Sequence, residues 1–201
     1  MRIKTMLTRP LVASLVGLMV ATAGSGALMA QTKESFGPRA GKQPPPEQAS
    51  PAQVVAEHGA WKIQCETAPP ANGQDQAQRS CGMVQGTKSE KNPKAVLTLV
   101  LVKTKVADKE QYNMRVIAPI GVFLPTGVAL EIDGNAVGRV PFTRCMPQLC
   151  MAFAEASPET LTKMKKGNEA NFIIYEAPGI GLPMKLSLSG FSAALSDLDN
   201  Y

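Results

Sequence analysis

The stretch AVLTLVLVKTK, residues 95–105, is apolar on both faces of an extended chain and partly β-branched. A strand with one face in water alternates between apolar and polar residues, whereas a strand covered on both faces reads as a nearly continuous apolar run. β-Branched residues also favour extended backbone. We therefore predict that residues 95–105 form a central strand of a two-layer β structure.

The segments on either side of this strand alternate instead. In WKIQC, residues 61–65, Trp61, Ile63 and Cys65 share one face, and the lysine and glutamine between them share the other. Alternation is typical of a half-buried strand. PMKLSLSGF alternates in the same way, and further short apolar stretches with strand character are YNMRVIAPI, GVALEID, NAVGRVPFTRC, CMAFAEA and NFIIYEA, separated by turn residues. A chain of about seven to nine short strands predicts an all-β antiparallel β-sandwich rather than a parallel α/β sheet.

One segment has helical signals. In SPETLTKMKKG, Ser157 is a suitable N-cap and Pro158 stands at the first helical position. Leu161 and Met164 share a face, and Gly167 can end the helix. The sequence therefore predicts one short helix between Ser157 and Gly167.

The N-terminus has the composition of a targeting segment. Three basic residues precede an apolar run over residues 11–23, and small residues follow. This order is typical of a secretory signal peptide, here residues 1–30, with cleavage after Ala27 or Ala30. Because the run is too short to span a bilayer comfortably, we predict no transmembrane segment in the mature chain.

The rest of the chain divides into a linker and one domain. Residues 31–56 are rich in Pro, Gln, Lys and Ala, which predicts a flexible tether. Residues 57–201 carry the strand-like segments and suffice for a single core. Without the three basic residues of the signal peptide, 18 of the 21 basic residues remain against 16 acidic ones, a net charge of +2. This weak charge gives no electrostatic footprint for nucleic acid, so no nucleic-acid binding is expected.

The chain has four cysteines, Cys65, Cys81, Cys145 and Cys150, all beyond the signal peptide. An exported compartment is oxidising, so an even number of cysteines predicts two structural disulfides. The sequence alone permits three connectivities. If the cysteines that are neighbours in sequence pair, one disulfide closes a loop of about 17 residues and the other a loop of about six. The spacing favours Cys65 with Cys81 and Cys145 with Cys150.

The motif CMPQLCM, residues 145–151, has two other possible uses. Thiolate and thioether sulfur are soft ligands suited to cuprous copper, and a reactive dithiol can exchange electrons. A redox motif more typically has two intervening residues at a helix N-terminus, whereas four residues separate Cys145 from Cys150 in strand-like sequence. We predict a structural disulfide and keep copper binding and redox chemistry as alternatives; no cofactor or metal is predicted.

The inventory of catalytic side chains is small. His58 is the only histidine, at the junction of tether and domain, and we expect it in a solvated loop. No GxSxG elbow accompanies it, and one histidine cannot build a His-based zinc site. Asp133 is assigned to a tight turn, and Glu159 to the first helical turn. The lysines among residues 163–166 are assigned to a solvated helix end rather than to an acidic ligand. We predict no catalytic residue, and therefore a protein that is not an enzyme.

Four ordered blocks of the domain carry a family resemblance. They are WKIQCE at 61–66, APIGVFLPTGVALEIDG at 118–134, VPFTRCMPQLCMA at 140–152 and LPMKLSLSGFSAALSDL at 182–198. Together, over residues 59–198, they resemble the invasion-associated locus B family of exported bacterial proteins. The resemblance implies an immunoglobulin-like β-sandwich, an exported location in a Gram-negative cell and, in some pathogenic members, a contribution to host-cell entry. It supplies no catalytic residues.

The leading functional hypothesis is a non-enzymatic protein of the periplasm or outer surface, or a secreted one, that binds an envelope or host-surface protein or glycan. One alternative is a periplasmic housekeeping or chaperone-like factor. The other is a redox or copper-handling periplasmic protein, which requires free or metal-bound thiols at Cys145 and Cys150. Neither the partner nor the oligomeric state has a signature in the sequence.

Overall fold

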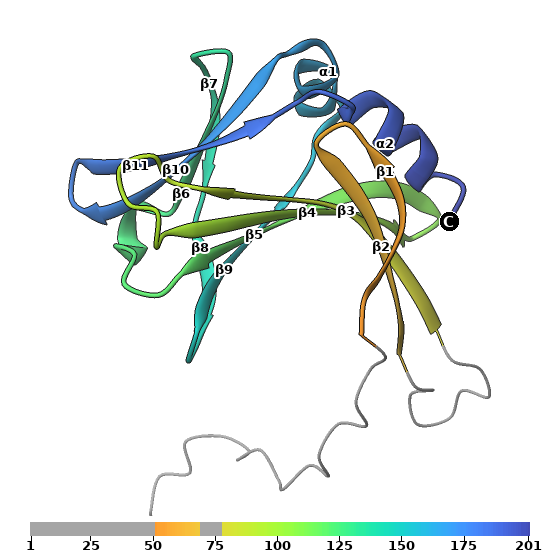
Figure 1. Cartoon of the computed structure of the whole chain (residues 1–201), viewed down its shortest axis with the longest axis horizontal. Coiled ribbons are helices and arrows are strands. Elements are labelled where there is room, and N and C mark those ends of the chain that lie inside the picture. The colour runs from red at the N-terminus through yellow and green to blue at the C-terminus, as the bar shows by residue number, and fades with distance from the viewer. Residues whose placement is uncertain (1–50, 69–77) are drawn as a thin grey trace, which may run out of the picture. The chain divides into compact units, whose positions relative to one another are not determined.

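Two antiparallel sheets enclose one hydrophobic core in the computed structural model, which describes residues 51–68 and 78–201 (Figure 1). The seven-stranded sheet has the order β1-β2-β3-β4-β5-β9-β8, and the four-stranded sheet has the order β11-β10-β6-β7. The elements of the larger sheet are β1 (Gln53–His58), β2 (Trp61–Ala68), β3 (Gln78–Lys88), β4 (Val96–Val106), β5 (Lys109–Pro119), β8 (Phe142–Met146) and β9 (Leu149–Glu155). The others are η1 (Leu124–Thr126), β6 (Val128–Ile132), β7 (Asn135–Val140), α1 (Pro158–Lys166), β10 (Glu169–Ala177), β11 (Ile180–Ser187) and α2 (Phe191–Leu198). The predicted all-β antiparallel sandwich is confirmed.

β4 is the central strand that its apolar run predicted. It lies between β3 and β5, paired with both along most of its length. Leu97, Leu99 and Leu101 face the core and are fully buried, while Val102 on the opposite face is only 5% exposed. The rest of that face is only partly covered, since Val96 is 42% exposed and Thr98 and Val100 are half-buried, so β4 is a central strand with two unequally buried faces.

The alternating segment at residues 61–65 also lies as predicted. Trp61, Ile63 and Cys65 of β2 point into the core. The Trp61 ring meets the Phe191 ring edge to face at 5.2 Å between centroids, and its Nε1 donates to the Ser187 carbonyl oxygen at 3.1 Å. One side chain therefore joins β2 to β11 and α2.

α1 begins and ends where its capping residues predicted. The Ser157 hydroxyl accepts a hydrogen bond from the Thr160 N–H at 3.1 Å, and Pro158 is the first helical residue. The Gly167 N–H donates to the Lys163 carbonyl oxygen at 2.9 Å. Met164 is fully buried against the sandwich, as its shared face with Leu161 required.

The prediction of a single helix is wrong, because a second helix, α2, closes one end of the sandwich. Its buried residues are Phe191, Ala194, Leu195 and Leu198, which recur at helical spacing. The strict alternation of β11 just before this helix predicts a strand that continues into it. The break is Gly190, which has a φ of +83° and starts the helix without a side-chain cap. A side chain at Gly190 would collide with the His58 carbonyl oxygen, so only glycine lets α2 start this close to β1.

The predicted tether boundary at residue 56 is also wrong. β1 begins at Gln53 and pairs with β2 from Gln53 opposite Cys65 to His58 opposite Trp61. An edge strand needs backbone partners on one side only, and Val54 and Val55 stay exposed. The segment therefore lacks the alternation that reveals a strand. The signal peptide and the tether up to residue 50 lie outside the described residues. Neither helix of the described chain is long and apolar enough to cross a membrane.

Candidate binding site

The four cysteines form two cross-strand pairs. Cys65 on β2 lies opposite Cys81 on β3, and Cys145 on β8 lies opposite Cys150 on β9. Their Cα atoms are 4.1 and 4.0 Å apart, and all four cysteines are disulfide-bonded. The structure therefore pairs the cysteines as their spacing predicted, and in the CMPQLCM motif a disulfide closes the hairpin of β8 and β9.

His58 does not lie in a solvated loop, so that expectation is wrong. It ends β1, its side chain is 28% exposed, and its Nε2 lies 2.7 Å from Oδ2 of Asp197 on α2. The hydrogen bond with His58 lowers the pKa of the Asp197 carboxyl, and Asn200 adds to this effect. The only histidine therefore fastens the first strand to the last helix.

The acidic residues singled out in the sequence have structural partners. Both carboxylate oxygens of Asp133 accept from the Asn168 N–H at 3.1 Å, in the turn that the sequence predicted. Glu159 pairs with Lys163 at 2.8 Å in the first turn of α1. Within residues 51–68 and 78–201, no group of three His, Cys, Asp or Glu side chains is close enough to hold a metal ion.

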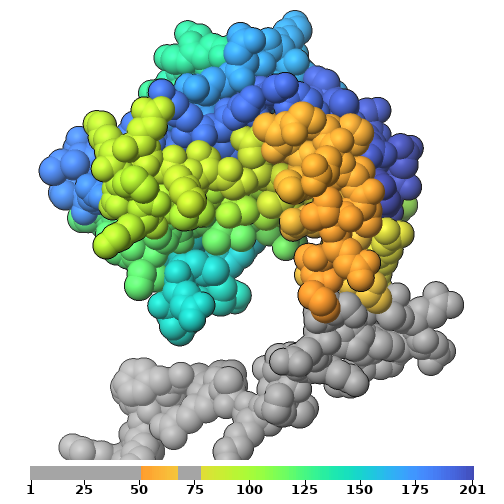
Figure 2. Space-filling view, in the orientation of Figure 1, coloured from red at the N-terminus to blue at the C-terminus, as the bar shows by residue number. Residues whose placement is uncertain are grey.

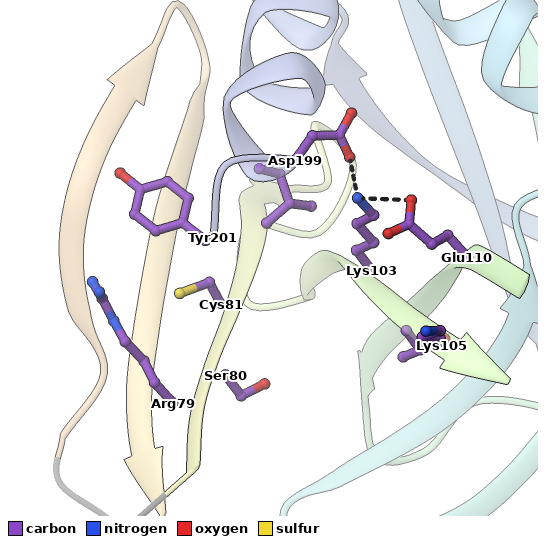
Figure 3. A pocket seen from close by; sticks show the side chains of 10 residues that line it. Arg79, Ser80, Cys81, Lys103, Lys105, Glu110, Asp199 and Tyr201 are labelled. Carbon is purple, nitrogen blue, oxygen red and sulfur yellow. Dashed lines mark ion pairs between the residues drawn. The ribbon is translucent and has the colours of Figure 1, made fainter. Parts of the chain in front are cut away.

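A polar pocket of about 360 Å³ lies where the end of the chain passes the larger sheet (Figure 3). Four segments build it: the start of β3, the second half of β4, the start of β5 and the residues that end and follow α2. Its lining residues are Arg79, Ser80, Cys81, Lys103, Thr104, Lys105, Glu110, Leu198, Asp199 and Tyr201. We call this site the polar pocket.

Local structure brings these segments together. β4 and β5 are joined by Ala107 and Asp108, both with positive φ, which is the geometry of a tight type I′ hairpin turn. The turn places Lys103 near Glu110 on the neighbouring strand. Burial of the apolar face of α2 directs the following residues, including Asp199, across the end of the same hairpin.

Ion pairs fix the charged groups of the polar pocket. The Lys103 ammonium lies 3.0 Å from a Glu110 carboxylate oxygen and 3.3 Å from Oδ1 of Asp199, and Figure 3 shows it between the two. The Tyr112 hydroxyl donates to the same Asp199 oxygen. Glu110, and secondly Asp199, raises the pKa of Lys103, so its ammonium stays charged at neutral pH.

The other cations of the polar pocket have weaker partners. Lys105 pairs with the exposed Asp108 at 3.3 Å. The Arg79 guanidinium lies over the Tyr201 ring, 5.5 Å from its centroid, and its N–H groups can donate hydrogen bonds to a ligand. Together with the hydroxyls of Ser80 and Thr104, these groups suit a polar ligand that both donates and accepts hydrogen bonds.

We expect the free energy of unfolding to fall at alkaline pH because Tyr112 holds its proton more tightly in the folded chain than in the unfolded chain. Burial, and then Asp199, raises the pKa of Tyr112 from 10.0 to about 12. The unfolded chain loses this proton near pH 10 while the folded chain keeps it, so the contribution of Tyr112 is complete below pH 10 and is lost as the pH rises through 12. Urea unfolding below pH 10 and near pH 12 should therefore show a smaller decline for Tyr112→Phe than for the parent. Equal declines in the two proteins would contradict the assignment.

The comparisons with known proteins identify the family. The family model described as invasion associated locus B (IalB) protein matches residues 61–199. The chain belongs to the invasion-associated locus B family. The matched range contains both disulfides and every lining residue of the polar pocket except Tyr201.

Relatives agree with this assignment. Invasion protein B homologs of Brucella abortus strain 2308 and of Brucella abortus biovar 1 strain 9-941 are each 28% identical over 136 residues, covering 67% of this chain and 73% of the relative. The crystal structure of invasion associated protein B from Bartonella henselae is 22% identical, with a TM-score of 0.55, and the match covers 75% of this chain and 96% of that one. That likeness shows a shared fold.

Sequence reasoning found the disulfides of this invasion-associated locus B protein but not its polar pocket. The lining residues come from positions as far apart as Arg79 and Tyr201, and Cys81 alone among them is a site residue that the sequence predicted. One signal was available: Lys103 follows the alternating core residues of β4 and so continues the core face beyond the apolar run. A charged residue at that position needs a partner, but its identity depends on α2, which the sequence reading missed.

Proposed function

We propose that this invasion-associated locus B protein is exported and acts without catalysis, by binding a polar group of an envelope or host-surface protein or glycan in the polar pocket. The observation that carries the proposal is the polar pocket itself, with its charges held in place by one another. Fixed donors and acceptors favour binding because they need little rearrangement when a ligand arrives. Two cross-strand disulfides suit the oxidising compartments outside the cytoplasm.

The protonation states in the polar pocket also favour binding over acid–base chemistry. An efficient general acid or base has a pKa near the working pH. Here the pKa of Lys103 is raised above its ordinary value, and the pKa of Tyr112 is raised to about 12. Near pH 7 Lys103 is therefore a fixed cation, and the Tyr112 hydroxyl keeps the proton that it donates to Asp199.

The test is a quantitative pull-down from bacterial envelope and host-membrane extracts with residues 31–201 as bait. The pocket variant combines Arg79→Ala with Asp199→Asn, which removes one cation and one anion of the polar pocket. The control variant combines Glu57→Gln with Lys62→Met and removes a surface ion pair of 3.0 Å outside it. We expect the parent and the control to enrich the same partner, and the pocket variant to retain at most about a tenth of it, as for loss of a binding hot spot.

Equal capture by the pocket variant and the parent would contradict the proposal. Capture from the envelope extract alone would favour the housekeeping alternative over a role at the host cell. The first result compares two variants in one extract, and the second compares two extracts with the parent as bait.

A further inference from the structure

One end of the sandwich presents apolar side chains to solvent. Ile120 is 57% exposed, Leu124 in η1 is 47% exposed and Ile180 is 58% exposed. They lie on the segment between β5 and β6 and at the start of β11. Figure 1 shows both segments at the same end of the two sheets as the loop between β3 and β4. We call this end the loop pole and define it as residues 88–95, residues 120–124 and Ile180.

The loops of the loop pole hold fixed positions. The buried Ser89 hydroxyl accepts from the Lys91 N–H at 3.2 Å, and the Ala95 N–H donates to the Asn92 carbonyl oxygen at 2.9 Å. The Phe123 N–H donates to the Tyr175 carbonyl oxygen at 2.6 Å, which ties the residues before η1 to β10. The exposed apolar residues are therefore presented by an ordered scaffold.

Exposed lysines lie at the same end of the sandwich. Lys88 ends β3, and Lys91 and Lys94 lie on the β3–β4 loop; all three are exposed, and Lys94 lines a shallow hollow of about 200 Å³ together with Ile120. The acidic residues of this end are Glu90 and Glu176. Glu90 is paired with a fourth lysine, Lys185 on β11, at 3.2 Å. Within the loop pole three lysines stand against one acid, Glu90, and adding the neighbouring Lys185 and Glu176 leaves the same excess of two positive charges.

We propose that the loop pole docks the protein on the surface of an anionic lipid bilayer. Aliphatic side chains on convex loop tips can enter the boundary between headgroups and acyl chains, and adjacent lysines then lie at the depth of the anionic headgroups. Ile120, Leu124 and Ile180 supply the apolar contact, and Lys88, Lys91 and Lys94 supply the charge complementarity. Figure 2 shows the β3–β4 loop and the β10–β11 turn projecting together at the left of the molecule.

The loop pole is a second site, separate from the polar pocket of the proposed function, and its position sets how the polar pocket would be oriented on a membrane. β4 runs from Val96, beside the loop pole, to Val106, beside the polar pocket. At about 3.3 Å per residue, a strand of this length separates the two sites by roughly 30 Å. A bilayer at the loop pole therefore leaves the polar pocket facing away from the lipid and open to a partner.

The experiment is vesicle co-sedimentation of residues 31–201 with phosphatidylcholine vesicles, with or without phosphatidylglycerol. The apolar variant combines Ile120→Ser, Leu124→Ser and Ile180→Ser, and the charge variant combines Lys88→Gln, Lys91→Gln and Lys94→Gln. The matched control combines Val54→Ser, Val55→Ser and Val106→Ser, which replaces three aliphatic residues that are 46%, 38% and 53% exposed elsewhere. Unchanged melting temperatures establish that all variants are folded.

We expect the parent and the control to bind phosphatidylglycerol vesicles and to bind phosphatidylcholine alone weakly. The charge variant should bind the anionic vesicles about fivefold more weakly for each lysine removed, and added salt should weaken the parent in the same sense. The apolar variant should not sediment. Equal binding by the parent and the apolar variant, or no preference for phosphatidylglycerol, would overturn the proposal. The pocket variant Arg79→Ala, Asp199→Asn should sediment like the parent, so failure of the polar pocket and failure of the loop pole are distinguishable.

Discussion

Replacing Trp61 with alanine is expected to lower the free energy of unfolding by about 3–5 kcal/mol, the cost of removing a large aromatic side chain from a packed core. Trp61 is fully buried, packs edge to face on Phe191 and donates to the Ser187 carbonyl oxygen. Its removal leaves a cavity and weakens the contact of α2 with the sheet. The effect should exceed that of any single surface substitution, because no side chain close by can fill the space.

Urea denaturation of purified protein measures this effect. Trp61→Phe serves as the intermediate variant, since it keeps most of the ring contact and loses the indole hydrogen bond, and Val106→Ala serves as the exposed control. The expected order of stability is Val106→Ala, then Trp61→Phe, then Trp61→Ala. A loss below about 1 kcal/mol for Trp61→Ala, typical of a surface site, would mean that this core does not hold the two sheets together.

Removing the disulfides should give the second-largest effect. In the chain-entropy account, replacing Cys65 and Cys81 with serine costs about 3 kcal/mol, and replacing Cys145 and Cys150 costs about 2 kcal/mol. The first pair closes the longer loop, with a sequence separation of 16 against 5. Cys81 also lines the polar pocket, so only the Cys145→Ser, Cys150→Ser protein, whose backbone pairing across β8 and β9 remains, should keep partner binding at a permissive temperature.

The same variants test the alternative uses of the CMPQLCM motif. Melting, cuprous-ion binding under reducing conditions and partner capture are compared between the parent and the Cys145→Ser, Cys150→Ser protein. A structural disulfide predicts a lower melting temperature with preserved capture. Unchanged melting together with lost copper binding or lost capture would instead support a copper or redox role.

The parts of the fold that the sequence predicted correctly are those whose signal is local. β4 was predicted from an apolar run over consecutive residues, and α1 from Ser157, Pro158 and Gly167 within one turn of its ends. The disulfide pairs follow from cysteines that are close in sequence. In each case the residues that determine the structure are neighbours along the chain, so one sequence contains the necessary information.

The parts that were missed depend on distant contacts. The spacing of Phe191, Ala194, Leu195 and Leu198 was available as a helical pattern, but it follows directly on the alternation of β11. β1 owes its strand conformation to β2, and His58 owes its position to Asp197. The polar pocket needs α2 in place before Lys103 and Asp199 can meet. Because the sequence did not predict α2, it could not predict the polar pocket either.

The measurement that tests the binding account most directly is photocrosslinking in intact cells that express the full chain. A photoreactive amino acid replaces Ser80, whose side chain lines the polar pocket, or Ala136, which is exposed on β7 outside it. The account predicts a discrete light-dependent adduct from position 80, absent from position 136 and lost when Arg79→Ala and Asp199→Asn are added. No adduct at position 80, or the same adducts from both positions, would contradict it.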